Sequence, residues 1–123
     1  MELFKVMNLP DGHLLQNGKY RLTHVVGQGG FGITYRGVWY TEVKGSLGTV
    51  KTEVPICVKE YFFKDYCYRE PGSKAVKVHS ETGKVLFNKF KEKLIKEAKI
   101  LSEVHHPYIV NVLEVFEENN TAY

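Results

Sequence analysis

A run of glycines between two β-type segments is the feature that most constrains this chain. Residues 27–32 read Gly-Gln-Gly-Gly-Phe-Gly, and the segments on either side, 20–26 and 33–40, are rich in β-branched and aromatic residues. Glycine lets a backbone approach phosphate oxygens closely and leaves N–H groups free to donate. A dinucleotide-binding loop of similar spacing needs a helix directly after the glycines. The strand-type residues that follow therefore favour a hairpin that covers phosphate over a Rossmann oxidoreductase.

A lysine lies near the end of the next strand-type segment, residues 53–61. Strand side chains alternate between faces, so Lys59 shares its face with Cys57, and the apolar residues of the segment share the other face. A lysine in an apolar strand needs an anionic partner unless it reaches water at the strand end. Both alternatives are open from the strand alone.

The sequence predicts one main helix over residues 86–104. Apolar residues recur on one face at helical spacing, and they are Phe90, Leu94, Ala98 and Leu101. Glu97 falls on this apolar stripe, between Leu94 and Leu101. An acidic residue that faces a core needs a cation, so Lys59 and Glu97 are a candidate ion pair. The alternative is that Glu97 lies at the edge of the stripe and is solvated.

The glycine hairpin, the strand lysine and the helix glutamate, in this order, resemble the N-terminal lobe of a protein kinase. The similarity is closer still to bacterial serine/threonine kinases of the Hanks type. The segments that carry it are Leu9–Gly12, Tyr20–Leu22, Gly27–Tyr35, Val58–Phe62, Glu97–Ala98, His106–Pro107, Ile109–Val110 and Thr121–Tyr123. The resemblance implies an α+β fold, a twisted antiparallel five-stranded sheet with one main helix, without the C-terminal lobe. Residues 1–18 would be an N-terminal extension, and residues 19–123 the lobe, cut in its fifth strand.

The resemblance also implies a role for each matching residue. The loop that would cover the ATP phosphates consists of Gly27, Gln28, Gly29, Gly30, Phe31 and Gly32. Lys59 would hold the α- and β-phosphates, and Glu97 would orient Lys59. Val26 and Cys57 would contact the adenine. Thr34 and Cys57 stand where most kinases have valine and alanine, so the pocket wall stays small but gains a hydroxyl and a thiol.

The catalytic loop and the metal site of a kinase are not in this sequence. No Asp-Phe-Gly or His-Arg-Asp triplet occurs, so the resemblance places the base and the magnesium ligands in a longer parent. The parent would be a cytoplasmic serine/threonine kinase that uses ATP and magnesium on a protein substrate. The alternative is a pseudokinase lobe that binds nucleotide or docks protein without phosphotransfer.

Three expectations follow for the 123-residue chain by itself. It should transfer no phosphate. It should bind ATP weakly, with a dissociation constant on the order of 1 mM, or about −4 kcal/mol, because only the roof of the site is present. It should self-associate through the exposed cleft face or the strand edge at Thr121–Tyr123, in the absence of the C-terminal lobe that would cover them.

Composition excludes several other functions. A net charge of +3 is too small to indicate nucleic acid binding, and the helix lysines are explained by a solvated face, with a docking face for acidic segments as the alternative. No apolar run reaches the length of a membrane span, and the N-terminus lacks a secretion signal.

Cys57 and Cys67 are expected to be free thiols. The adjacent His105 and His106 lack further ligands, so no metal site is predicted. Aromatic residues near Phe62 are expected to pack locally.

Strands are predicted near residues 20–27, 32–40, 53–61, 109–117 and 121–123, with a short one within 74–79. The connection over residues 41–52 contains three small turn-forming residues and is expected to be a mobile loop. Turns are expected at residues 10–12, 17–18, 71–73, 80–83 and 119–120.

Overall fold

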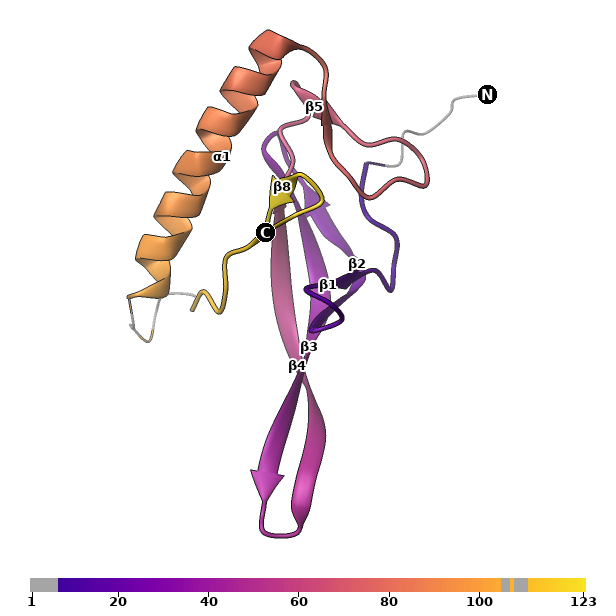
Figure 1. The fold of residues 1–123 in the computed structure, drawn as a ribbon, viewed down its shortest axis with the longest axis vertical. Coiled ribbons are helices and arrows are strands. Elements are labelled where there is room, and N and C mark those ends of the chain that lie inside the picture. The colour runs from indigo at the N-terminus through magenta and orange to yellow at the C-terminus, as the bar shows by residue number, and fades with distance from the viewer. Residues whose placement is uncertain (1–6, 105–106, 108–110) are drawn as a thin grey trace.

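The computed structural model describes residues 7–104, 107 and 111–123. It is an α+β structure in which one long helix stands beside a curled antiparallel sheet, with two small hairpins near one end (Figure 1). The strands are β1 Leu14–Leu15, β2 Tyr20–Gln28, β3 Gly32–Gly45, β4 Gly48–Tyr61, β5 Cys67–Tyr68, β6 Lys77–Val78, β7 Glu117–Glu118 and β8 Thr121–Ala122, and the helix is α1 Glu81–Ser102. The predicted α+β class is confirmed, and the described residues contain the one main helix that was expected.

The main sheet has four strands, in the order β1-β2-β3-β4, so the prediction of five strands is wrong. Residues 111–116 form no strand, and residues 109–110 of the predicted strand lie outside the described part of the chain. β8 pairs with β7 in a separate hairpin, closed at Asn119 and Asn120 with φ angles of 55° and 60°. The Thr121 hydroxyl donates to the Tyr61 carbonyl oxygen at the end of β4. This side-chain hydrogen bond, and not a backbone ladder, joins β8 to the end of β4.

The fourth strand comes instead from the N-terminal segment. β1 pairs antiparallel with β2, with Leu15 opposite Tyr20. Leu9 and Leu15 are fully buried, and the Leu9 N–H donates to the Tyr35 hydroxyl oxygen at 3.0 Å. Residues 7–18 are therefore packed onto the sheet and contribute to its core.

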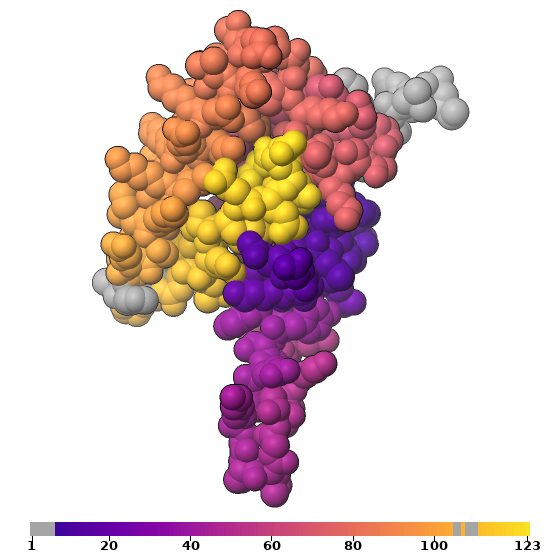
Figure 2. Space-filling model, in the orientation of Figure 1, coloured from indigo at the N-terminus to yellow at the C-terminus, as the bar shows by residue number. Residues whose placement is uncertain are grey.

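β3 and β4 continue beyond the rest of the sheet as a projecting arm (Figures 1 and 2). The loop predicted over residues 41–52 is instead a regular hairpin, because the β3–β4 register runs unbroken to Gly45 opposite Gly48. Val43 lies opposite Val50 in this arm, and β-branched residues favour extended backbone. The Leu47 side chain at the tip is fully exposed.

The helix begins earlier than the sequence predicts. Ser80 is its N-cap, and the Ser80 hydroxyl accepts a hydrogen bond from the Gly83 N–H at 3.0 Å. The predicted turn at residues 80–83 is therefore the cap and first turn of α1. The helix ends at Ser102, within two residues of the predicted end.

The face that α1 turns to the core also differs from the prediction. Gly83 and Phe87 are buried, and the Tyr61 hydroxyl donates to the Phe87 carbonyl oxygen at 2.9 Å. Phe90 and Leu94 of the predicted core stripe are 36% and 45% exposed. The helix is thus attached through its first half, and the C-terminal segment lies beside it (Figures 1 and 2).

Candidate functional site

The register of the sheet places Lys59 beside the glycine loop. Thr34 lies opposite Lys59, and Gly32, the last loop residue, lies opposite Tyr61. Directly opposed residues project from the same face of a sheet, as do alternate residues of one strand. Thr34, Cys57 and Lys59 therefore project from a single face.

This face is open in the described structure. Cys57 and Lys59 are exposed, whereas Val58, between them, is buried on the other face. A bulge in β2 between Val25 and Gly27 makes Val26 the extra residue, and Val26 is 59% exposed. The residues predicted to line an adenine site are therefore accessible.

Two backbone hydrogen bonds anchor the tip of the glycine loop. The Phe62 N–H donates to the Phe31 carbonyl oxygen at 2.9 Å, and the Lys64 N–H donates to the Gly30 carbonyl oxygen at 3.3 Å. All described peptides are trans, and in a trans peptide the C=O and the following N–H point in opposite directions. The N–H groups of Phe31 and Gly32 therefore point away from the anchoring segment. Neighbouring N–H groups of this kind suit an anion.

The loop glycines differ in what surrounds them. A Cβ at Gly32 would lie 2.9 Å from the Glu60 carbonyl oxygen, so the close approach of β4 requires glycine there. Gly27, Gly29 and Gly30 have no such neighbour within 4 Å and no positive φ. Nothing in the described structure requires glycine at these three positions, whereas close approach of a ligand to the backbone would. The loop therefore fits a phosphate-bearing group.

The expected ion pair between Lys59 and Glu97 is not formed. Both residues are exposed, and neither takes part in the four ion pairs found among the described residues. The reason is the way α1 is held: its contact with Tyr61 is made at Phe87, and Glu97 lies about 15 Å further along the helix. The structure brings together the loop, Lys59 and Cys57, but not Glu97.

Sequence reasoning missed a buried ion pair on the opposite face of β4. Glu60 is 1% exposed, and its carboxylate accepts from the Arg69 guanidinium at 2.6 Å and from the Tyr35 hydroxyl at 2.9 Å. The Tyr123 hydroxyl donates to the same carboxylate. Burial, and then the charge of Glu60, raise the pKa of Tyr35 and that of Tyr123 above the usual tyrosine range. The one sequence signal was an acidic residue on the apolar face of a strand.

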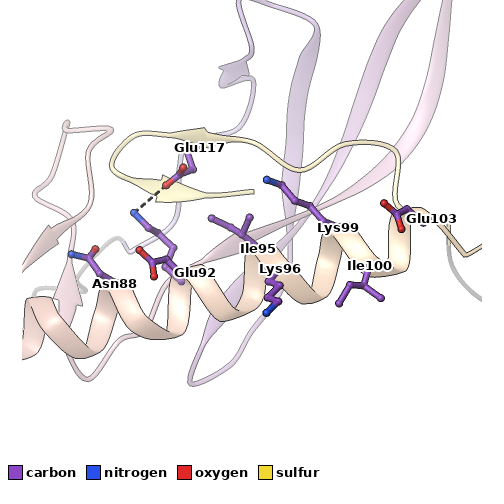
Figure 3. A pocket seen from close by; sticks show the side chains of 9 residues that line it. Asn88, Glu92, Ile95, Lys96, Lys99, Ile100, Glu103 and Glu117 are labelled. Carbon is purple, nitrogen blue, oxygen red and sulfur yellow. Dashed lines mark ion pairs between the residues drawn. The ribbon is translucent and has the colours of Figure 1, made fainter.

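A groove of about 640 Å³ lies between α1 and the β7 hairpin, and none of the predicted site residues lines it (Figure 3). Three lysines and three glutamates line it together with Asn88, Ile95 and Ile100. Lys91 and Glu117 form an ion pair across it at 3.1 Å. With both signs of charge present in equal number, the groove does not select for an anion or a cation.

The order of these elements is that of a kinase-like N-terminal lobe: a glycine loop between two strands, a lysine on the next strand, then a helix. In fold the chain is similar to PpkA-294 in its apo form, a fragment of a serine/threonine kinase from Pseudomonas, with a TM-score of 0.78 and 28% sequence identity. The match covers 94% of this chain but only 37% of the PpkA structure. The sequence matches no protein-family model, and the curated proteins give no match.

None of the helices in the described part of the chain is both long and apolar enough to cross a membrane.

Proposed function

We propose that this chain is the ATP-binding N-terminal lobe of a bacterial serine/threonine kinase. The observation that carries the proposal is the loop geometry: the N–H groups of Phe31 and Gly32 point away from the segment that anchors the loop, and the exposed Lys59 lies close by in the β3–β4 register. The similarity to PpkA-294, a bacterial kinase fragment, supports the same class.

Each residue has a distinct part in this proposal. The loop amides donate to phosphate oxygens, and the Lys59 ammonium neutralises their charge. Val26 and Cys57 contact the adenine from the open face, with Thr34 beside them. Bound ATP supplies the phosphoryl group. Glu97 orients Lys59 when α1 shifts toward the sheet.

Ligand-observed NMR with magnesium and ATP tests the proposal. Lys59→Met should weaken ATP binding, because it removes the cation beside the loop. Lys51→Met is the matched control: it removes an exposed lysine from the same face of the same strand, in the projecting arm. We expect the wild type to bind at millimolar ATP, Lys51→Met to bind equally well and Lys59→Met to bind several-fold less. Equal affinity in both variants would contradict the proposal.

The separation of Lys59 from Glu97 favours a second candidate, a nucleotide-binding lobe without phosphotransfer. The two candidates differ in a polypeptide that also contains a C-terminal lobe. A kinase would transfer phosphate from ATP to protein, and Lys59→Met would abolish the transfer. A pseudokinase lobe would bind ATP with no transfer in either form.

A further inference from the structure

Three phenylalanine rings connect the glycine loop to the helix. Phe31, at the loop tip, lies 4.4 Å from Phe63 and 6.2 Å from Phe90, measured between ring centroids. Phe63 and Phe90 lie 5.6 Å apart, so the three rings contact one another in pairs. They come from three separate parts of the chain: the loop, the segment after β4, and α1. We call them the phenylalanine cluster.

The cluster is partly solvent-exposed. Phe63 is 8% exposed, Phe90 36% and Phe31 58%. Tilted and edge-to-face aromatic pairs each contribute about 0.5–1.5 kcal/mol beyond the burial of their surface. Such a contact is strong enough to favour one loop position and weak enough to open. The exposed positions of Phe31 and Phe90 also mean that the core does not depend on them.

The ring contacts and the backbone hydrogen bonds hold the loop tip against the same segment, residues 62–64. Phe62 and Lys64, on either side of Phe63, donate to the carbonyl oxygens of Phe31 and Gly30. The ring of Phe31 and the carbonyl groups of the loop tip are thus held on the same side, by residues 62–64. The N–H groups that would meet phosphate are left on the other side.

We propose that Phe63 and Phe90 are positioning residues that hold the glycine loop in its phosphate-binding position. This proposal rests on the proposed function, because it assigns the loop a phosphate ligand. Without the ring contacts, the loop tip samples positions in which the Phe31 and Gly32 N–H groups no longer point together. Phosphate binding then weakens, while contacts to the nucleoside do not change.

The cluster also couples the loop to α1. Phe90 and Glu97 lie two helical turns apart, on the same side of the helix. A movement of α1 that carries Glu97 toward Lys59 must therefore change the contact between Phe90 and Phe31. Loop position and helix position are linked through this one ring.

Hydrogen exchange of the amides that hold the loop tests the positioning role without nucleotide. Phe90→Ala should speed exchange at Gly29, Phe62 and Lys64, whose N–H groups donate to carbonyl oxygens of the loop. Leu94→Ala, one turn along the same exposed stripe and without an aromatic contact to the loop, should not. Phe90→Tyr keeps the ring and should restore slow exchange. Phe63→Leu, a milder change at the buried member, should also speed exchange if the cluster holds the loop.

A comparison of ATP with adenosine shows whether the cluster positions the loop for phosphate. A general loss of stability would not distinguish the two ligands. Phe90→Ala should lower the affinity for ATP several-fold and leave the affinity for adenosine unchanged, with Leu94→Ala at wild-type values for both. Equal loss for ATP and adenosine would overturn the proposal, and so would unchanged exchange at Gly29, Phe62 and Lys64 in both Phe90→Ala and Phe63→Leu. If the wild-type protein bound no ATP at millimolar concentration, the proposed function would be overturned. The claim that the phenylalanine cluster supports phosphate binding would be overturned with it. The exchange data would still decide whether the cluster holds the loop.

Discussion

The two faces of β4 differ sharply at adjacent residues. Glu60 is buried and bonded to Arg69, Tyr35 and Tyr123, which come from three other parts of the chain. Lys59, one residue away, is exposed and takes part in no ion pair found among the described residues. One face of the strand holds the lobe together, and the other is open to a ligand.

This difference shows that two charged residues in one strand can serve separate purposes. A buried ion pair leaves little freedom in how its segments attach, because breaking it leaves an uncompensated charge. The Glu60 cluster thus joins β4 to residues 62–80, the segment between β4 and α1, and to Tyr123, which directly follows β8. An exposed lysine contributes little to stability, so it can be kept for binding.

The largest expected effect is on stability. Glu60→Ala should lower the free energy of unfolding by about 3–5 kcal/mol, because the buried Arg69 charge is left unpaired. Lys59→Ala should change it by no more than about 0.5 kcal/mol, as for an exposed residue without partners. Urea unfolding followed by circular dichroism measures both.

A double variant sharpens this result. Glu60→Leu combined with Arg69→Met removes both charges, so it should be less destabilising than Glu60→Leu alone. If Lys59→Ala and Glu60→Ala lowered the free energy of unfolding by similar amounts, the two faces would not differ as described.

Alkaline pH provides the next comparison. Burial raises the pKa of the Cys67 thiol to about 12, and burial with Glu60 raises the pKa of Tyr35 and that of Tyr123. These groups are neutral in the folded chain, whereas unfolded thiols ionise near about pH 8.5 and unfolded tyrosines near about pH 10. Their contribution to stability is therefore complete below those values and is lost as the pH rises above them.

Unfolding measured from neutral to strongly alkaline pH should show this decline. Lys59→Met should follow the same curve as the wild type, because it alters only the open face. Tyr123→Phe should flatten the decline above about pH 10, since phenylalanine does not ionise. A stability that rises with pH in this range would contradict the assignment.

The smallest expected effect concerns the two cysteines. Cys57 lies exposed on the open face, and Cys67 is buried in the core. An alkylating reagent should modify Cys57 in the native protein and leave Cys67 unmodified until the chain unfolds. ATP should slow the modification of Cys57, because we place adenine against it. Mass spectrometry of the labelled peptides reads both sites, and equal labelling of the two thiols would contradict the burial pattern.

Local sequence signals predicted much of the fold. Strand-type residues placed β2, residues 32–40 of β3 and residues 53–61 of β4, and the apolar period found α1. The start of α1 was missed because Ser80 and Gly83 resemble a turn, and only the cap bond shows that the helix begins there. The arm was missed because the small residues near Gly45 suggest a loop, whereas the Val43–Val50 pair continues the hairpin.

The site could be predicted only in part. The glycine loop and Lys59 are adjacent in the sheet, so motif order was enough to bring them together. The position of Glu97 depends on how α1 docks, which Phe87 and Tyr61 decide rather than the apolar stripe. Arg69, the ion-pair partner of Glu60, lies in the connection between β5 and β6, and no periodic pattern links this connection to β4.

The central claim is that nucleotide binds the face of β4 that carries Lys59. Backbone NMR of the chain titrated with magnesium and ATP tests this claim most directly. The expected chemical-shift changes are confined to the glycine loop at residues 27–32 and to β4 around Cys57 and Lys59, and Lys59→Met reduces them. Changes centred on the groove at Lys91 and Glu117, or no changes at millimolar ATP, would contradict the account.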